Sequence, residues 1–228
     1  MSTYKLSNLI RARFPMIYIT TFEEDRVTQY IKSVVTDEKQ VKFPREVFKW
    51  TQTSGLFNDT TGKAITDTTC PCKMLEFVRK YDKDAVFIIY DFHTNFGPKN
   101  RTPDYNVIRK VRDIVPDLKL GAVRKTLFFI SPELLIPESL QKEITIYDFP
   151  LPTLSEIKAK FNNMINQNKS VKIELAEEDK DKLCKAALGL TLQEAESAFA
   201  LAMVNDGKID MQDLPIILEE KVQVIKKT

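Results

Sequence analysis

The feature that most constrains this chain is the hexapeptide AVFIIY at residues 85–90, which is apolar throughout. Strands of a parallel sheet are covered on both faces, so they appear in a sequence as continuous apolar runs rather than as alternating patterns. Two further strand-like runs, PMIYIT at residues 15–20 and TLFFI at residues 126–130, are separated from it by helical patterns. Strands that alternate with helices predict a doubly wound α/β sheet.

The remaining elements of this α/β region follow from apolar periodicity and from helix-breaking residues. Two more strands are expected at residues 46–50 and 144–149, and a long polar loop with two glycines at residues 51–68. Pro71 is expected in the first turn of a helix capped by Thr68 or Thr69, and Pro116 is expected to kink or break its helix. The expected helices span residues 3–12, 23–35, 71–79 and 104–120.

A change of periodicity near Pro150 and Pro152 predicts a domain boundary. Residues 1–150 are expected to form the α/β core, and residues 151–228 a small lid made only of helices. Thr191 and Glu194 have the spacing of a capping box, and Gly207 is expected to end the third of these helices. The four expected helices span residues 154–168, 176–188, 191–205 and 211–226.

Composition excludes several classes of protein. Of 228 residues, 43% are hydrophobic, which suits a packed core, and the net charge of +2 gives no general attraction to nucleic acid. We expect a cytoplasmic protein without a membrane span, because no apolar run approaches the roughly 18 residues that a span requires and no signal peptide is evident. The odd count of three cysteines argues against a disulfide framework. Cys70 and Cys72 with one histidine, His93, are too few ligands for a metal site.

A phosphate-binding loop is missing where the α/β pattern would place it. Strand 15–20 ends at Thr20 and runs directly into Thr21-Phe22-Glu23, without the motif G-x-x-x-x-G-K-[ST] whose backbone amides surround a phosphate. Gly62-Lys63 is the nearest substitute. However, six residues separate Gly55 from Gly62, and Ala64 stands where the magnesium-binding hydroxyl belongs. We therefore expect a surface loop there.

Asp91 follows the apolar strand 85–90 and resembles the Walker B aspartate that holds the magnesium of a bound nucleotide. Catalysis would need an acidic residue beside it, and Phe92 occupies that place. We expect Asp91 and His93 to close the strand and cap the next turn; a vestigial or ligand-sensing role is the alternative. With one histidine, no serine–histidine–acid set is convincing, and independent catalysis is not expected.

Basic residues gather around the expected helix 104–120, where acidic residues interleave with them. A solvated helix face is the expectation, with phosphate contact as the alternative. The basic residues are Arg101, Arg109, Lys110, Arg112, Lys119, Arg124 and Lys125.

Taken in order, seven segments make the chain resemble the degenerate N-terminal cassette of two-part AAA+ ATPases of bacteria, cyanobacteria and chloroplasts. The resemblance runs from Leu9 to Lys227 and implies a P-loop NTPase-like core with a helical lid. It places Ser131 at the sensor position, where active cassettes have asparagine, and residues 141–143 in the arginine-finger region without an arginine. The segments are LIRARFPMIYITTFEEDRV, VFKWTQTSGL, AVFIIYDFHTNF, VIRKVRD, FFISPELLIPESLQKEITIYDFPLPT, LGLTLQEAESAFALAM and LEEKVQVIKK.

From this resemblance we expect a non-catalytic module that serves assembly, regulation or client recognition for an active AAA+ cassette, in cis or in trans. No cofactor is expected for the module itself; ATP and magnesium would act through the associated cassette. One alternative is a nucleotide sensor without hydrolysis, for which Thr20, Thr21, Asp91 and Ser131 are vestigial candidates. Another is a stand-alone adaptor or inhibitor of an ATPase ring. A homo-oligomer and a protein client are further expected partners, whereas nucleic acid is not. The charged helix at Thr228 favours a fragment over a complete protein.

Overall fold

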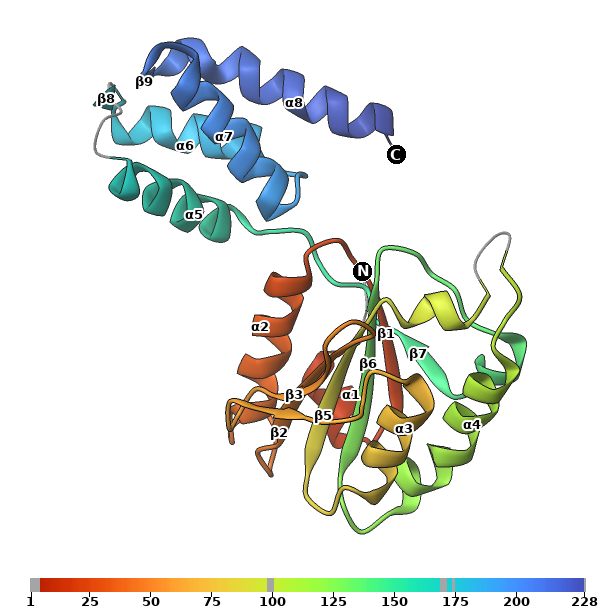
Figure 1. Cartoon of the computed structure of the whole chain (residues 1–228). Coiled ribbons are helices and arrows are strands. Elements are labelled where there is room, and N and C mark those ends of the chain that lie inside the picture. The colour runs from red at the N-terminus through yellow and green to blue at the C-terminus, as the bar shows by residue number, and fades with distance from the viewer. Residues whose placement is uncertain (1–4, 98–100, 169–171, 174, 228) are drawn as a thin grey trace. The chain divides into compact units, whose positions relative to one another are not determined.

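A computed structural model describes residues 5–97, 101–168, 172–173 and 175–227 of the chain (Figure 1). The chain divides into two compact units, Met1–Phe149 and Pro150–Thr228. Each unit has its own buried apolar core. We therefore describe each unit by itself.

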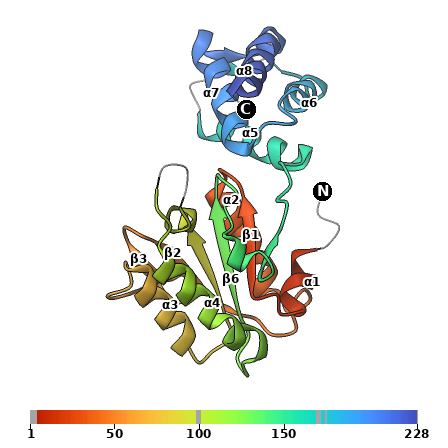
Figure 2. The same cartoon turned by 90° about the vertical axis from the view of Figure 1, so that its right-hand side faces the viewer.

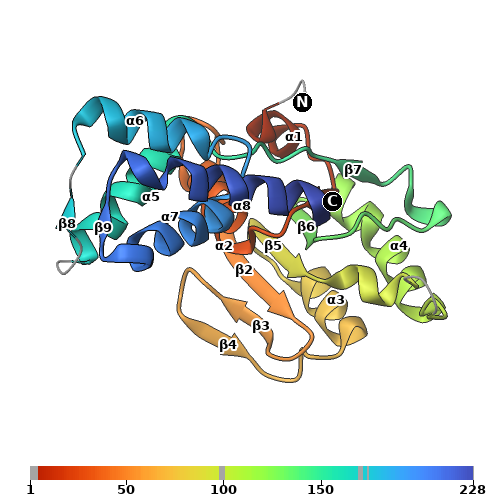
Figure 3. The ribbon, with the colours of Figure 1, turned by 90° about the horizontal axis from the view of Figure 1, so that it is seen from above.

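In the described residues, unit 1 contains a seven-stranded sheet in the order β4-β3-β2-β5-β6-β1-β7 (Figure 3). The pairs β2–β5, β5–β6, β6–β1 and β1–β7 are parallel, whereas β2–β3 and β3–β4 are antiparallel. The expectation of a doubly wound, mainly parallel sheet is confirmed. The strands are β1 (Met16–Thr20), β2 (Glu46–Thr51), β3 (Gly55–Asn58), β4 (Lys63–Ile65), β5 (Ala85–Tyr90), β6 (Lys125–Ser131) and β7 (Ile144–Ile146).

Alternate residues of the central strands supply two separate cores, one on each face of the sheet. Every residue of β5 and of β6 is buried, which is why both segments are apolar runs. Helices α1 and α2 cover one face, and α3 and α4 cover the other (Figure 2). The bounds are α1 (Leu6–Arg11), α2 (Glu24–Thr36), α3 (Pro71–Lys80) and α4 (Tyr105–Leu120), with the short 3₁₀ turns η1 (Phe92–Asn95) and η2 (Glu138–Leu140).

The long loop expected at residues 51–68 is wrong, because this segment contains β3 and β4. Gly55 adopts a φ of +72° at the turn into β3, and Gly62 adopts +71° at the turn into β4. Lys63 therefore begins a strand and not a helix. Strands of four and three residues give too little alternation to be recognised among polar neighbours.

The expected cap of α3 is also wrong, because Cys70 occupies the N-cap position without a side-chain hydrogen bond. The Thr68 hydroxyl instead serves the hairpin: it accepts from the backbone N–H of Leu56 (2.8 Å) and donates to the carbonyl of Ile65 (2.7 Å). Pro116 was expected to kink or break its helix; the helix is not broken there, since α4 continues through the proline. Buried residues on both sides of the proline hold that turn in place.

Unit 2 is built mainly from α5 (Leu154–Gln167), α6 (Glu177–Ala186), α7 (Leu192–Asp206) and α8 (Leu214–Lys227). The Thr191–Glu194 capping box forms as expected, and Gly207 ends α7 in the left-handed region. The expectation of helices alone is wrong. Two-residue strands β8 (Lys172–Ile173) and β9 (Lys208–Ile209) pair in parallel, and the 3₁₀ turn η3 (Met211–Asp213) precedes α8.

We predict that Gly55→Ala destabilises unit 1 more than Gly62→Ala. Both alanines would need a positive φ, which costs about 1 kcal/mol or more. Only the Cβ at Gly55 would meet another atom, the Thr68 hydroxyl oxygen at 2.8 Å, whereas nothing lies within 4 Å at Gly62. Urea denaturation followed by the fluorescence of Trp50, which bonds to the Thr68 carbonyl, measures the difference. Equal losses for the two variants would contradict the proposed clash.

Candidate functional site

The carboxyl ends of β1, β5 and β6 bring the four sequence candidates to one edge of the sheet. Thr20 is paired in register with Ser131, and the N–H of Thr21 donates to the Ser131 carbonyl (2.9 Å). Asp91 follows β5, and its N–H donates to the carbonyl of Ile130 (2.9 Å). In open α/β sheets, ligands bind outside the carboxyl ends of the strands. This edge is therefore the candidate functional site.

The turn from β1 to α2 is too short to surround a phosphate. Only three residues, 21–23, link the strand to the helix, whereas a phosphate loop wraps the anion with a longer run of backbone amides. The Thr21 hydroxyl accepts from the N–H of Glu23 (3.0 Å). Glu23 is buried and pairs with Arg26 (2.9 Å). Side chains of this chain thus organise the turn.

Acidic residues occupy the helix N-terminus that would otherwise attract an anion. Glu24 and Asp25 lie in the first turn of α2. Burial raises the pKa of Glu24 above its ordinary value, and the charges of Asp91 and Asp25 raise it further. Because Asp91 acts on Glu24 across the edge, the electrostatic field there disfavours another negative group.

Asp91 has a strained backbone, and its carboxylate does not cap the turn that follows it. Its φ is +51°, in the left-handed region that few residues other than glycine adopt. It occupies the N-cap position of η1 without a side-chain bond to that turn; the hydroxyl of Thr94 donates to its carbonyl instead (2.9 Å). The expected cap is therefore made by the backbone of Asp91. Phe92, in the place of a catalytic acid, is buried in the core.

Ser131 is buried and its hydroxyl is engaged within the chain. The hydroxyl oxygen lies 2.6 Å from Nδ1 of His93 and 3.0 Å from the carbonyl of Glu133. Oδ1 of Asp91 lies 3.8 Å from the same His93 nitrogen. A hydrolytic triad needs the serine and the acid on opposite ring nitrogens. These three side chains therefore meet but do not form a nucleophile–base–acid relay.

Tyr18 is a member of this edge that the sequence reasoning missed. Its hydroxyl donates to the carbonyl of Glu133 (2.6 Å) and accepts from the N–H of Leu135 (3.4 Å). Burial is the main cause that raises the pKa of this phenol. A tyrosine in an apolar strand was the available signal, but its partners lie more than 100 positions away in sequence.

The basic residues around α4 are mostly paired with acidic residues or buried. Lys125 is buried in β6 and donates to the carbonyls of Val78, Arg79 and Tyr81. This supports a solvated helix face over a phosphate-binding surface. The ion pairs are Arg109–Asp113, Lys110–Glu76, Lys119–Glu143 and Arg124–Asp84.

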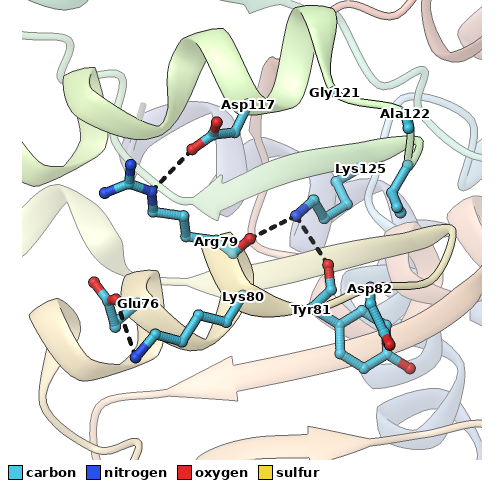
Figure 4. A pocket seen from close by; sticks show the side chains of 10 residues that line it. Glu76, Arg79, Lys80, Tyr81, Asp82, Asp117, Gly121, Ala122 and Lys125 are labelled. Carbon is cyan, nitrogen blue, oxygen red and sulfur yellow. Dashed lines mark hydrogen bonds and ion pairs between the residues drawn. The ribbon is translucent and has the colours of Figure 1, made fainter.

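A cavity of about 490 Å³ lies at the opposite, amino end of the parallel strands, between the ends of α3 and α4 (Figure 4). Arg79 and Asp117 bridge the two helices across it (3.0 Å). Lys125 projects from β6 toward the end of α3, where three carbonyls, at 2.9–3.0 Å, take up its N–H groups. The ammonium group of Lys125 therefore caps the carboxyl end of α3.

The described residues contain no group of three or more histidine, cysteine, aspartate or glutamate side chains that could hold a metal ion. Cys70 is exposed, Cys72 half-buried and Cys184 buried, each as a free thiol. Within the same residues, no helix has both the length and the apolar content needed to cross a bilayer.

Family models match both units of the chain. Residues 2–149 match the N-terminal domain of SpoVK-like AAA ATPases, and residues 155–228 match the second domain of the same proteins. The uncharacterized AAA domain-containing protein ycf46 of Guillardia theta is 33% identical over 224 residues, which are 96% of this chain and 41% of the relative. The protein of the same name from Pyropia yezoensis is 28% identical over 228 residues, 99% of this chain and 43% of the relative. The chain thus spans about two fifths of the length of these relatives.

Solved structures share the fold at low sequence identity. A variant of RuvB from Thermotoga maritima aligns with a TM-score of 0.53 at 12% identity, over 93% of this chain and 65% of that one. Domain III of the Thermotoga maritima replication initiation protein DnaA aligns with a TM-score of 0.51 at 15% identity, over 93% of this chain and 88% of that one. These likenesses concern the fold alone.

We predict that Glu24→Gln stabilises unit 1 at pH 7. A raised pKa means that the folded chain binds this proton more tightly than the unfolded chain, so the free energy of unfolding falls as Glu24 ionises with rising pH. The gain should vanish below about pH 4, where the carboxyl is protonated in both states. Urea denaturation followed by Trp50 fluorescence at the two pH values measures it.

Glu46→Gln is the control with the opposite sign. A hydrogen bond from the Tyr81 hydroxyl (2.7 Å) is the main cause that lowers the pKa of Glu46, and Asn58 adds a second bond (2.9 Å). The stability that this carboxylate contributes is present above its ordinary pKa and is lost as pH falls. Glu46→Gln should therefore destabilise unit 1 at pH 7, with a deficit that shrinks in acid. Shifts of the same sign for both variants would contradict these assignments.

Ser131→Ala should destabilise unit 1 by about 1–2 kcal/mol, because it removes the bonds of the buried Ser131 hydroxyl to the half-buried His93 ring and to the carbonyl of Glu133. Thr94→Ala is the matched control, since its hydroxyl bond to Asp91 is exposed and its loss should stay within about 0.5 kcal/mol. Denaturant midpoints at one pH compare the two variants. If the two variants lose equal stability, the bonds of the Ser131 hydroxyl do not stabilise the edge.

Proposed function

We propose that this chain of 228 residues, which belongs to the SpoVK-like AAA ATPase family, forms a non-catalytic module for assembly, regulation or client recognition. Such a module would work with an active AAA+ cassette, either in the same polypeptide or in a separate one. Homo-oligomerisation and a protein client are part of the same proposal. ATP and magnesium would act at the active cassette and not at this one.

The observation that carries the proposal is the electrostatic character of the carboxyl-end edge. A bound nucleotide would place its phosphates at the N-terminus of α2, against Glu24 and Asp25. The three-residue turn offers few amides to offset this repulsion. Phosphate binding at a helix N-terminus depends on free amides and on the absence of competing anions. The α2 terminus fails the second condition, because Glu24 and Asp25 lie in its first turn.

The remaining chemical positions argue the same way. Phosphoryl transfer depends on placed cations, metal ligands and a residue that orients the nucleophile. At the edge, Asp91 has the buried Phe92 beside it instead of a second acid. The Ser131 hydroxyl is hydrogen-bonded to His93 and to the carbonyl of Glu133. The scaffold is preserved, while Phe92 and the Ser131 hydroxyl are engaged within the chain. Preservation of this kind supports a role for its surfaces.

We predict that MgATP is neither hydrolysed by the chain nor able to raise its melting temperature. A ligand at 100 times its dissociation constant would add about 2.7 kcal/mol to the free energy of unfolding, which thermal denaturation detects readily. An active P-loop ATPase assayed in parallel provides the positive control for both measurements.

Two results would separate the alternatives. Thermal stabilisation by ATP without turnover would replace the proposal with a nucleotide sensor at this edge. Magnesium-dependent turnover above background that is lost in Asp91→Ala would contradict the non-catalytic proposal outright.

A further inference from the structure

Two large apolar side chains lie exposed on the segments that leave the carboxyl-end edge. Phe22, in the turn after β1, is 77% exposed, and Leu134, in the segment after β6, is 51% exposed. An exposed aromatic side chain on a short, well-connected turn gains nothing for the fold. Single exposed apolar residues are common on protein surfaces, whereas a large apolar side chain flanked by charged groups can anchor a partner.

Direct bonds hold the two segments next to each other. The N–H of Thr21 donates to the carbonyl of Ser131 (2.9 Å), so Phe22 and Leu134 leave the sheet from neighbouring strands. The hydroxyl of Tyr18 fixes the second segment through the carbonyl of Glu133 (2.6 Å). The apolar groups therefore stand on ordered backbone, which limits the entropy cost of binding.

Exposed carboxylates flank the apolar side chains. Glu24 and Asp25 follow Phe22 in the chain and begin α2, and Glu133 precedes Leu134. Asp91 follows β5, the strand that pairs with β6. The charge of Asp91 acts on both Glu24 and Tyr18, and that of Glu133 also acts on Tyr18. These groups consequently share one local field. We name Phe22, Leu134 and the four carboxylates the acidic edge surface.

We propose that the acidic edge surface docks a segment of a protein partner in which apolar side chains lie between arginines or lysines. This inference rests on the proposed function and names the chemistry of the client or partner. Charge complementarity selects the occupant: carboxylates repel nucleotides, nucleic acids and anionic lipid surfaces, whereas they attract cationic side chains. The exposed aromatic ring also suits a guanidinium, which stacks on aromatic faces.

The energetic roles of the two kinds of residue differ. Phe22 and Leu134 would become buried, and truncation of such an anchor causes a large loss of affinity. The carboxylates would steer the encounter, so their contribution should fall as ionic strength rises. The surface therefore predicts salt-sensitive binding with an apolar component that survives salt.

The test uses the full chain and two fluorescent peptides, one of alternating leucine and arginine and one of alternating leucine and glutamate. Fluorescence anisotropy should show binding of the arginine peptide, weakened by salt, and no comparable binding of the glutamate peptide. Phe22→Ser should weaken the arginine peptide about tenfold, and so should the double variant Glu24→Gln, Asp25→Asn at low salt.

Matched controls are available in the same chain. Tyr105→Ser removes another aromatic ring, 71% exposed on α4. Glu177→Gln with Glu178→Gln removes two of the three acidic charges in the first turn of α6. Both controls should bind the arginine peptide as the unmodified chain does, and thermal melts should show that every variant is folded.

Several outcomes overturn the inference: absent binding of the arginine peptide, equal binding of both peptides, or equal losses in the edge and control variants. Sedimentation that shows self-association abolished by Phe22→Ser would assign the surface to a second copy and also overturn it. These failures are distinct from failure of the proposed function, which would appear as stabilisation or turnover with MgATP. Inert MgATP together with absent peptide binding rejects the docking surface alone.

Discussion

The parallel pairing of β5 with β6 and of β6 with β1 is the constraint on which unit 1 depends. Burial of these strands on both faces fixes their register, because a slip by one residue would exchange the side chains that serve the two cores. The same register sets where Thr20, Asp91 and Ser131 emerge. The geometry of the edge is thus a consequence of core packing.

At each end of the sheet, charged side chains lie at helix termini of opposite partial charge, and the sign of these side chains differs between the two ends. At the amino end, Lys125 and Arg45 donate to carbonyls at the ends of α3 and α1. At the carboxyl end, Glu24 and Asp25 face the positive terminus of α2. In a phosphate-binding fold the ligand completes that terminus. Here Glu24 and Asp25 supply the negative charge at that terminus. Burial and the charge of Asp91 nevertheless raise the pKa of Glu24 and so disfavour its ionised form.

The parts of this structure that depend on local pattern could be predicted, and the parts that depend on distant pairing could not. AVFIIY and TLFFI identified β5 and β6, and the ordered segments identified the AAA+ family, both of which are confirmed. The β3–β4 hairpin could not be predicted because its strands are short and lie among polar residues. The Ser131–His93 contact and the partners of Tyr18 escaped because they require knowing that β1, β5 and β6 are neighbours.

The residues in the turn from β1 to α2 give a physical interpretation of the missing phosphate loop. A deletion alone would leave a helix N-terminus with unsatisfied amides and a site open to stray anions. The chain instead carries a short turn, an internal Glu23–Arg26 pair and acidic residues at that place, with Phe22 turned outward among them. Under the proposed function, these features would make the edge independent of nucleotide and would favour cationic over anionic ligands. The proposed loss of phosphate binding and the proposed cation-favouring surface would therefore arise from the same few residues.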